Sequence, residues 1–403
     1  MPEGAGRFDA SVPPSGENRK LRVVSISHTA YSRASGRLRY EPLADDPGLE
    51  LTLVVPERWH EYGNDYCADP PSPGLDIRVE PVRLLKAGPA LWYLHHYTKL
   101  GRLLREKRPD VIHLWEEPWS LVAAQAEWLR NRYLPDAAVV LETDQNILRR
   151  MPPPFEHMRR RMLARTDLLI GRAEEALNVS RASGYDGPTE IVEYGADHAV
   201  FRPGDRDAAR REFGASGLTL GYVGRLVPEK GLLDVLEAMA ASAAPTTLLV
   251  LGSGPQKEKL VARAAALGLG ERLKLFDPRP PAEVARFMSS LDALVLMSRT
   301  MRTWKEQFGR VIMEAQACGV PVIGSSSGSI PGVVDRGGWI VPEGDAPALA
   351  RLLDRLRANP EEVSAAGAAG REDALTRFTY DAVASAMRRA WTRAADARHA
   401  RRG

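Results

Sequence analysis

Two glutamates stand eight positions apart in the segment Glu306–Glu314, among residues that suit a ligand rich in hydroxyl groups. An apolar run at 293–297 precedes this segment and another follows Pro321, so the pattern predicts strand, loop, helix and strand. Glu306 then lies in a loop at the carboxyl end of a parallel strand, where open α/β sheets bind ligands. Gly309 allows close approach of the backbone, and the first N–H groups of the helix are free. Carboxylates beside exposed amides could bind a sugar or a ribose.

A second segment combines two cations with the start of a helix. The strand-like run 218–223 leads into Gly224 and Arg225, Lys230 follows, and the amphipathic run 232–240 predicts a helix. Two cations beside the N-terminus of a helix form an anion site, for which a diphosphate is a natural ligand. The alternative is a pair of surface cations near an ordinary strand-to-helix turn.

Two further loops carry weaker signals. The apolar run 248–251 leads into Gly252 and Gly254, in a turn that alone is more often plain turn chemistry than a ligand loop. A strand-like run at 273–276 then leads into a proline-rich loop that contains Pro278. Their order along the chain places both beside the two segments described above.

Together these segments resemble the retaining glycosyltransferases of family 4, also called glycosyl transferases group 1, which have the GT-B fold. In that family the first glutamate of the E-x7-E segment contacts the donor sugar, the second contacts the ribose, and the G-R-L-x-x-x-K-G segment binds the donor phosphates. The resemblance therefore implies a donor site made of Gly224, Arg225, Lys230, Gly252, Gly254, Pro278, Glu306, Gln307, Phe308, Gly309 and Glu314.

Alternating strand and helix signals predict an α/β protein with parallel sheets. In the N-terminal half we expect strands at 21–26, 51–55, 77–82, 109–115, 138–141, 168–170 and 190–193, and a helix at 91–107. The resemblance implies two Rossmann-like lobes that face a central cleft. We expect a disordered tail at 1–20, an acceptor-side lobe at 21–195 and a nucleotide-sugar lobe at 196–375. A C-terminal helix that returns to the first lobe, with a basic tail, completes the chain at 376–403.

Polar side chains near the predicted strand ends of the N-terminal half are candidates for the acceptor side: His28, Gly36, His113 and Gln145. Many members of the resembling family have a histidine after the strand that we expect at 138–141, whereas this chain has Asp144. Asp144 could take a polar role near the donor sugar or the acceptor, or it could simply be a turn residue. His113 could equally be structural. The candidate catalytic residues are thus Arg225, Lys230, Glu306 and Asp144.

Composition narrows the class of protein. The 403 residues carry a net charge of +3, too small to argue for binding of nucleic acid, and the two cysteines form no metal or disulfide framework. No apolar run approaches the roughly 18 residues that a membrane span needs. We expect a cytoplasmic protein. Contact with the inner face of a membrane stays open, because cations gather at 92–108 and 159–165; a solvated charged surface is the alternative.

The resemblance implies transfer of a hexosyl group from a UDP- or GDP-sugar to a hydroxyl acceptor, with retention of configuration. The acceptor would be a polysaccharide or glycolipid precursor or a small molecule. Because Arg225, Lys230 and helix N-termini would stabilise the leaving diphosphate, and no Asp-x-Asp motif with supporting context is present, we expect neither a metal nor another cofactor. The alternatives are a sugar-nucleotide epimerase of GT-B type and a non-catalytic nucleotide-sugar-binding subunit. A dehydrogenase is disfavoured because neither half has G-x-G-x-x-G after its first strand.

Overall fold

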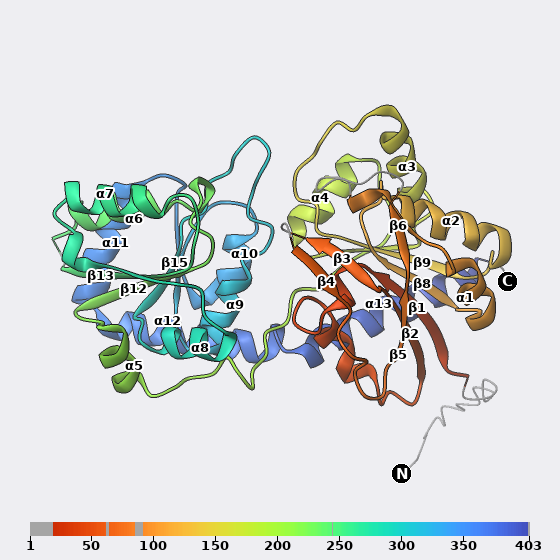
Figure 1. Ribbon diagram of the computed structural model, residues 1–403, viewed down its shortest axis with the longest axis horizontal. Coiled ribbons are helices and arrows are strands. Elements are labelled where there is room, and N and C mark those ends of the chain that lie inside the picture. The colour runs from red at the N-terminus through yellow and green to blue at the C-terminus, as the bar shows by residue number, and fades with distance from the viewer. Residues whose placement is uncertain (1–18, 62–63, 85–91, 244, 402–403) are drawn as a thin grey trace, which may run out of the picture.

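The computed structural model describes residues 19–61, 64–84, 92–243 and 245–401, which form two lobes, each built on a parallel sheet (Figure 1). The predicted fold class is confirmed. Most of the tail expected at 1–20 lies outside the described residues. Arg19, near its end, lies on the N-lobe surface, where its guanidinium is 2.7 Å from the carboxylate of Asp110.

The N-lobe contains a seven-stranded sheet in the order β11-β10-β9-β8-β1-β2-β5, in which every neighbouring pair is parallel. Its strands are β1 (Leu21–Ser27), β2 (Leu49–Pro56), β5 (Asp76–Glu80), β8 (Val111–Trp115), β9 (Ala138–Thr143), β10 (Leu168–Gly171) and β11 (Thr189–Ile191). The central strands β8 and β9 are buried along their whole length, as expected for a sheet covered on both faces.

Two separate apolar clusters cover the two faces of this sheet. One face packs against helices α1 (Leu100–Lys107), α2 (Leu121–Tyr133), α3 (Pro153–Leu163) and α4 (Glu174–Ala182). The other face packs against the loop after β1 and against α13 (Tyr380–Ala400), the last helix of the chain (Figure 1). Trp391 of α13 is completely buried there. The apolar side of α13 is thus part of the N-lobe core, although the helix follows the C-lobe in sequence.

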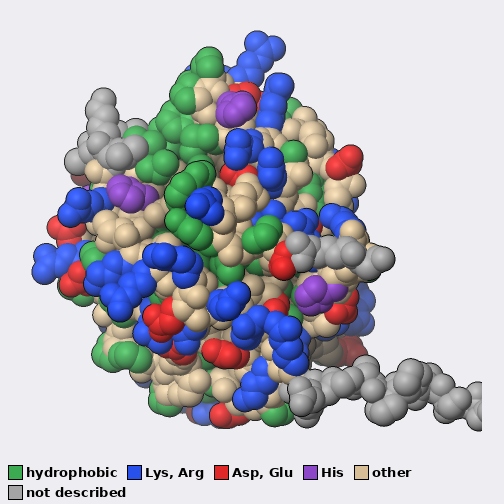
Figure 2. All heavy atoms as spheres, turned by 90° about the vertical axis from the view of Figure 1, so that its right-hand side faces the viewer, with side chains coloured by type: hydrophobic (Ala, Val, Ile, Leu, Met, Phe, Trp, Pro, Cys, Tyr) green, Lys and Arg blue, Asp and Glu red, His purple; other side chains and the backbone are tan. Residues whose placement is uncertain are grey.

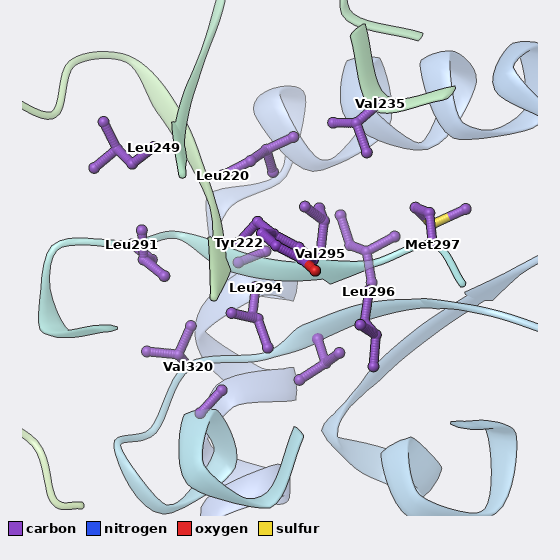
Figure 3. Packing of buried hydrophobic residues seen from close by; sticks show 14 of the residues in the cluster. Leu220, Tyr222, Val235, Leu249, Leu291, Leu294, Val295, Leu296, Met297 and Val320 are labelled. Atoms are coloured by element: carbon purple, nitrogen blue, oxygen red, sulfur yellow. The ribbon is translucent and has the colours of Figure 1, made fainter. Parts of the chain in front are cut away.

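The C-lobe contains a six-stranded parallel sheet in the order β14-β13-β12-β15-β16-β17. Its strands are β12 (Leu218–Val223), β13 (Thr246–Leu251), β14 (Leu273–Phe276), β15 (Ala293–Leu296), β16 (Val322–Ser325) and β17 (Gly338–Val341). The surrounding helices are α5 (Arg206–Phe213), α6 (Leu232–Ala241), α7 (Lys257–Ala266), α8 (Pro281–Ser289), α9 (Arg310–Ala317), α10 (Ile330–Val334), α11 (Ala346–Ala358) and α12 (Pro360–Arg377). Leucine, valine and isoleucine side chains of the strands interlock in one core (Figure 3).

The structure differs from the sequence expectation in one region of the N-lobe. The helix expected at 91–107 begins only at Leu100, and His95–Tyr97 instead forms strand β7, which pairs antiparallel with β6 (Val82–Leu84). The strand expected at 77–82 ends at Glu80, because Pro81 has no N–H with which to continue the ladder. The hairpin of β3 (Arg58–Glu61) and β4 (Asn64–Cys67) was not expected at all. Such short pairings depend on a partner strand rather than on local periodicity.

Within the described residues, none of the helices combines the length and the apolar character that crossing a bilayer requires.

Candidate active site

Lys230 and Glu306 meet at the carboxyl edge of the C-lobe sheet. Lys230 follows β12 and Glu306 follows β15, and these two strands are neighbours in the sheet. Nζ of Lys230 lies 2.6 Å from Oε2 of Glu306, and the hydroxyl of Ser298 donates a hydrogen bond of 2.7 Å to the same oxygen. The Glu306 side chain is 10% exposed and that of Lys230 is 14% exposed. The pair is therefore largely shielded from water but not fully buried.

The loops after β12 and β13 are in direct backbone contact beside this pair. A Cβ atom on Gly252 would stand 1.9 Å from the carbonyl oxygen of Gly224, so that only glycine fits at position 252. A Cβ atom on Gly254 would stand 2.4 Å from the carbonyl oxygen of Leu226. The glycines of both predicted loops thus allow the two loops to pack together at the edge where Lys230 stands.

Arg225 and Lys230 differ in their surroundings. The Arg225 side chain is exposed, and no hydrogen bond or ion pair of its guanidinium is found among the residues that the structure describes. Its backbone carbonyl accepts a hydrogen bond of 2.7 Å from the hydroxyl of Tyr222, which holds the start of the loop. Lys230 is engaged with Glu306 and lies 4.9 Å from the ring centre of Trp304. Arg225 is therefore the cation that is available to an arriving anion, whereas Lys230 is already oriented.

Glu314 lies inside helix α9, whose first residue follows Gly309. Burial raises the pKa of the Glu314 carboxyl to about 7, and the positive charge of Arg310 only partly opposes this shift. A partly buried carboxyl with such a pKa exchanges its proton near neutral pH, and hydrogen-bond donors from a ligand would favour its ionised form.

The remaining predicted donor residues occupy different environments. Phe308 is only 2% exposed and packs edge-to-face against Tyr194 at 5.2 Å, so its ring supports the lobe junction. Gln307 is exposed, and its side-chain amide donates to the backbone carbonyl of Asp144, in the other lobe, at 2.9 Å. Pro278 is exposed in the loop after β14.

The carboxylate of Asp144 is held by neighbours at the end of β9. It accepts hydrogen bonds from the guanidinium of Arg172 at 2.8 Å and from the hydroxyl of Tyr194 at 3.2 Å. Its side chain is 24% exposed. A catalytic role for Asp144 stays a prediction, and its present contacts join the loop after β9 to Arg172 and Tyr194.

His113 does not reach the cleft surface in this structure. It is completely buried and lies between the hydroxyl of Ser25, 2.8 Å from Nδ1, and the carboxylate of Glu142, 3.0 Å from Nε2. Burial lowers the pKa of His113 despite the contact with Glu142. Arg39 and Arg172 also pair with Glu142, and they lower the pKa of this buried carboxyl although burial by itself would raise it. The structural alternative for His113 fits this environment.

His28 belongs to a polar cluster that also contains His95 and Glu116. Nδ1 of His28 lies 2.7 Å from the Glu116 carboxylate, and Nε2 of His95 lies 3.6 Å from it. Burial acts to raise the pKa of Glu116, but the two histidines lower it to about 2. The ligand atoms lie within 4.8 Å of one another, so this cluster could hold a metal ion; its internal contacts also account for it without one. The expectation that no metal is needed stays a prediction.

The two other predicted acceptor-side residues lie in loops of the N-lobe. Gly36 faces the ring of Trp115, and a Cβ atom there would be 2.8 Å from it. The Gln145 side chain accepts a hydrogen bond of 3.1 Å from the N–H of Ile147 and so shapes the loop after β9.

Sequence reasoning missed Glu117, which organises the same loop. Its carboxyl oxygens contact the hydroxyl of Thr143 at 2.6 Å and the N–H of Asp144 at 3.2 Å. Burial raises the pKa of Glu117 to about 8. The position of Glu117 two residues after a buried strand was a signal, but nothing in the sequence placed Thr143 beside it.

Comparison with known proteins agrees with this architecture. Residues 205–373 match the family model described as glycosyl transferases group 1. The D-inositol 3-phosphate glycosyltransferase of Segniliparus rotundus is 31% identical over 252 residues, which cover 59% of this chain and 55% of that protein. The match thus spans about half the length of that relative. The protein of the same name from Corynebacterium jeikeium is 29% identical, over 98% of this chain and 93% of its own length.

Two solved structures of low sequence identity share the fold over nearly the whole chain. Sucrose-phosphate synthase from Thermosynechococcus elongatus superposes with a TM-score of 0.70 at 22% identity, covering 93% of this chain and 98% of that one. Anabaena Alr3699/HepE in complex with UDP gives a TM-score of 0.70 at 16% identity, with coverages of 93% and 99%. With its two Rossmann-like lobes the chain has the GT-B fold, and its C-lobe is similar to the group 1 glycosyl transferases.

Proposed function

We propose that this protein transfers a hexosyl group from a nucleoside diphosphate sugar to an acceptor hydroxyl. The observation that carries the proposal is the contact between Lys230 and Glu306, which joins the expected diphosphate site to the expected sugar site. Arg225, with no side-chain partner among the described residues, stands in the same loop as Lys230 and supplies a second cation. The matches to proteins named as glycosyltransferases support the same class of reaction.

In the proposed reaction, negative charge develops on the leaving diphosphate. Lys230 and Arg225 would bind its oxygens, and the free N–H groups at the start of helices α6 and α9 would add partial positive charge. Glu306 would accept hydrogen bonds from hydroxyls of the donor sugar, while Lys230 and Ser298 hold its carboxylate in place. A metal ion is not needed in this scheme, because the cations of the chain neutralise the leaving group.

Calorimetric titration of UDP and of GDP, with EDTA present, tests the donor site. We expect one of them to bind, and Lys230→Ala to weaken its binding about 10- to 100-fold, the range for a lost hydrogen bond to a charged group. Lys259→Ala is the matched control, since Lys259 is an exposed residue of α7. If neither nucleotide binds to folded wild-type protein, the proposed donor site is wrong.

Retention of configuration is the stereochemical part of the proposal, and it is supported by the resemblance of the Arg225–Lys230 and Glu306–Glu314 segments to retaining enzymes. In such a reaction the acceptor attacks from the face that the diphosphate leaves. Proton NMR of the first product formed distinguishes the two outcomes through the coupling constant of the anomeric proton. An inverted product would contradict this part of the proposal and leave the donor site standing.

For the acceptor we propose a hydroxyl of a polysaccharide or glycolipid precursor. A second candidate is a small phosphorylated polyol, because the relatives from Segniliparus and Corynebacterium are named for D-inositol 3-phosphate and the latter match extends over both lobes. Incubating the donor with D-inositol 3-phosphate, and separately with a lipid extract, and detecting products by mass spectrometry separates the two candidates.

Contact with an anionic membrane surface is a further part of the proposal. Helix α1 presents the exposed cations Arg102 and Arg105, and the exposed Arg108 follows its last residue. Arg105 lies 5.2 Å from the ring centre of Tyr133, which packs against Trp128, a residue that is 57% exposed. Figure 2 shows many Lys and Arg side chains on the side of the N-lobe that faces away from the C-lobe. Other cations of this lobe are paired with acids, such as Arg161 with Glu127, which favours a solvated surface. Sedimentation with anionic liposomes at low salt, compared with Arg102→Glu, decides between the two.

The two alternatives, an epimerase and a non-catalytic binding subunit, would each give a distinct experimental result. A sugar-nucleotide epimerase would convert the donor into its epimer without an acceptor, which chromatography of the nucleotide sugar detects. A non-catalytic binding subunit would bind nucleotide, yet Lys230→Ala would keep full activity in the pathway.

A further inference from the structure

A loop of the C-lobe contacts the N-lobe at the residue that carries the candidate sugar-binding carboxylate. The side-chain amide of Asn146, in the loop after β9, donates a hydrogen bond of 2.8 Å to the backbone carbonyl of Glu306, 160 positions away. Beside it, the side-chain amide of Gln307 donates to the backbone carbonyl of Asp144 at 2.9 Å. The two bonds run in opposite directions across the junction, and they join the 144–146 segment of one lobe to the 306–307 segment of the other.

The bond from Asn146 differs from the other contacts between these loops in its burial. Arg149 donates to the carbonyl of Thr303 at 2.7 Å, but this contact is exposed to water. Lys305 is paired with Glu175 at 2.5 Å, with each side chain 28% exposed. Asn146 is only 5% exposed. Because water competes little with a buried hydrogen bond, the Asn146 contact is the least weakened by solvent of the three.

The carbonyl of Glu306 is held from the C-lobe as well. The N–H of Ser329 lies 3.3 Å from this oxygen. At Gly328, which has a φ of +58°, a Cβ atom would stand 2.0 Å from the same oxygen. Glycine at position 328 therefore leaves room for the carbonyl, and the peptide of Glu306 is located by both lobes at once.

The side chain of Glu306 starts from that peptide and ends at Lys230 and Ser298. A rotation of the peptide would move the carboxylate relative to both partners. In catalysis, a misplacement of about 1 Å can cost on the order of 100-fold in rate. The contact of Asn146 with the Glu306 peptide can therefore affect the orientation of the Glu306 carboxylate.

We propose that Asn146 is a positioning residue, which on closure of the lobes orients the Glu306 peptide and so aims its carboxylate at the donor sugar. Asn146 acts through Glu306 and need not touch the substrate. This inference rests on the proposed function, because the donor sugar belongs to that reaction. In this proposal, the hydrogen bond of Asn146 couples closure of the lobes to the geometry of the donor site.

The loop that carries Asn146 is itself held in shape by the N-lobe. Thr143 and Asp144 are hydrogen-bonded to the carboxyl of Glu117, and the N–H of Gln145 donates to the hydroxyl of Thr143 at 3.1 Å. Asn146 is therefore presented from a preorganised turn, so its amide requires little further ordering to bind Glu306.

The test compares Asn146→Ala and Asn146→Asp with Arg150→Ala. The aspartate has the shape of asparagine but offers an oxygen in place of the N–H donor, so it faces the Glu306 carbonyl with repulsion. Arg150 is an exposed residue of the same loop and serves as the control. Three quantities are measured: the affinity for UDP and GDP, the turnover of UDP-glucose and GDP-mannose to free nucleotide, and amide hydrogen exchange of the segment 298–309.

We expect the Asn146 variants to bind the preferred nucleoside diphosphate within about twofold of wild type, because the diphosphate contacts lie within the C-lobe. Turnover should fall on the order of 10- to 100-fold, mainly in kcat, and more for Asn146→Asp than for Asn146→Ala. Hydrogen exchange in 298–309 should accelerate. Arg150→Ala should leave all three unchanged.

A double-mutant cycle separates positioning from a general structural role. If Asn146 acts through the Glu306 carboxylate, Asn146→Ala should have little further effect on turnover in a Glu306→Gln background. Full additivity of the two substitutions would overturn the proposal, as would unchanged hydrogen exchange in 298–309. The exchange experiment needs no ligand, so it tests the role of Asn146 even when wild-type protein binds neither nucleotide. Absence of nucleotide binding would instead defeat the proposed function.

Discussion

Nζ of Lys230 lies 2.6 Å from Oε2 of Glu306, although the two residues are 76 positions apart in the sequence. The contact exists because β12 and β15 are adjacent strands, so the loops at their carboxyl ends meet at one edge of the sheet. In the proposed reaction an arriving diphosphate would share Lys230 with Glu306. The pair therefore orients the lysine before the donor binds and keeps a carboxylate beside the sugar.

Replacing Glu306 by glutamine separates binding from catalysis. We expect Glu306→Gln to lower turnover on the order of 100-fold, comparable to the loss of one preorganised group that stabilises a transition state. Its affinity for the preferred nucleoside diphosphate should be unchanged or higher, because Lys230 loses a competing partner. Steady-state kinetics and calorimetry check both quantities, with Glu258→Gln as the exposed control on α7. Parallel losses of affinity and turnover would contradict this division of roles.

The affinity for nucleotide should depend on pH through Glu314. Its pKa is raised by burial to about 7, so the stability linked to this carboxyl is complete below its unfolded pKa and is lost as the pH rises through about 7. If ribose hydroxyls donate to the carboxylate, binding favours ionisation. Affinity should then fall by up to about tenfold for each pH unit below 7.

Calorimetry measures this dependence between about pH 5.5 and pH 8, the range in which Glu314 titrates. The nucleotide phosphate also titrates in this range, so Glu314→Gln serves as the reference. The variant should show only the phosphate contribution. An identical pH dependence in wild type and variant would remove Glu314 from the ribose site.

Gly252→Ala should damage the fold and the donor site together. The added Cβ would stand 1.9 Å from the carbonyl of Gly224, and backbone on both sides leaves no flexible side chain to move aside. We expect a loss of about 2–4 kcal/mol in the free energy of unfolding, with loss of nucleotide binding. Gly270→Ala is the control, since a Cβ there meets open space. Urea denaturation followed by circular dichroism measures the difference, and equal stability of the two variants would disprove the close approach of the loops.

Truncation of Trp391 should destabilise the N-lobe even though this residue lies near the end of the chain. Trp391 is completely buried in the N-lobe core and packs 5.4 Å from the ring of His113. We expect Trp391→Ala to cost about 3–5 kcal/mol, the usual range for removing a buried aromatic side chain. Trp128→Ala, at a residue that is 57% exposed, should change stability by less than about 0.5 kcal/mol. Chemical denaturation of both variants checks the contrast; a mild effect at Trp391 would mean that α13 contributes little to the lobe.

Much of the C-lobe could be predicted from the sequence because its signals are local. The apolar runs at 218–223 and 273–276 coincide with β12 and β14, and the amphipathic run 232–240 lies within α6. Alternation of strands and helices was enough for the parallel sheets. In the N-lobe the expectation of a helix at 91–107 was wrong for its first part, because pairing with β6 outweighs the local preference of His95–Tyr97.

The candidate site was predictable only as a set of residues. Arg225, Lys230, Glu306 and Glu314 stand out by type and spacing, and chain order places the first three after strand ends and Glu314 in the helix that follows. The neighbours of each were not predictable. His113 is enclosed with Glu142 and Ser25, and His28 contacts Glu116, because strands β1, β8 and β9 lie side by side. Register between distant strands decides which polar side chains meet, and it leaves no mark on local periodicity.

By itself, then, the sequence determined the α/β architecture, the family resemblance and the residues of the donor segments, because helix and strand periods and loop motifs are written over short stretches of chain. Only the tertiary structure decided that Lys230 pairs with Glu306, that Trp391 closes the core of the other lobe, and that Asn146 reaches the Glu306 carbonyl across the junction. These contacts join residues 76 or more positions apart. They form because packing of sheets and lobes brings distant surfaces together, which local preferences do not specify.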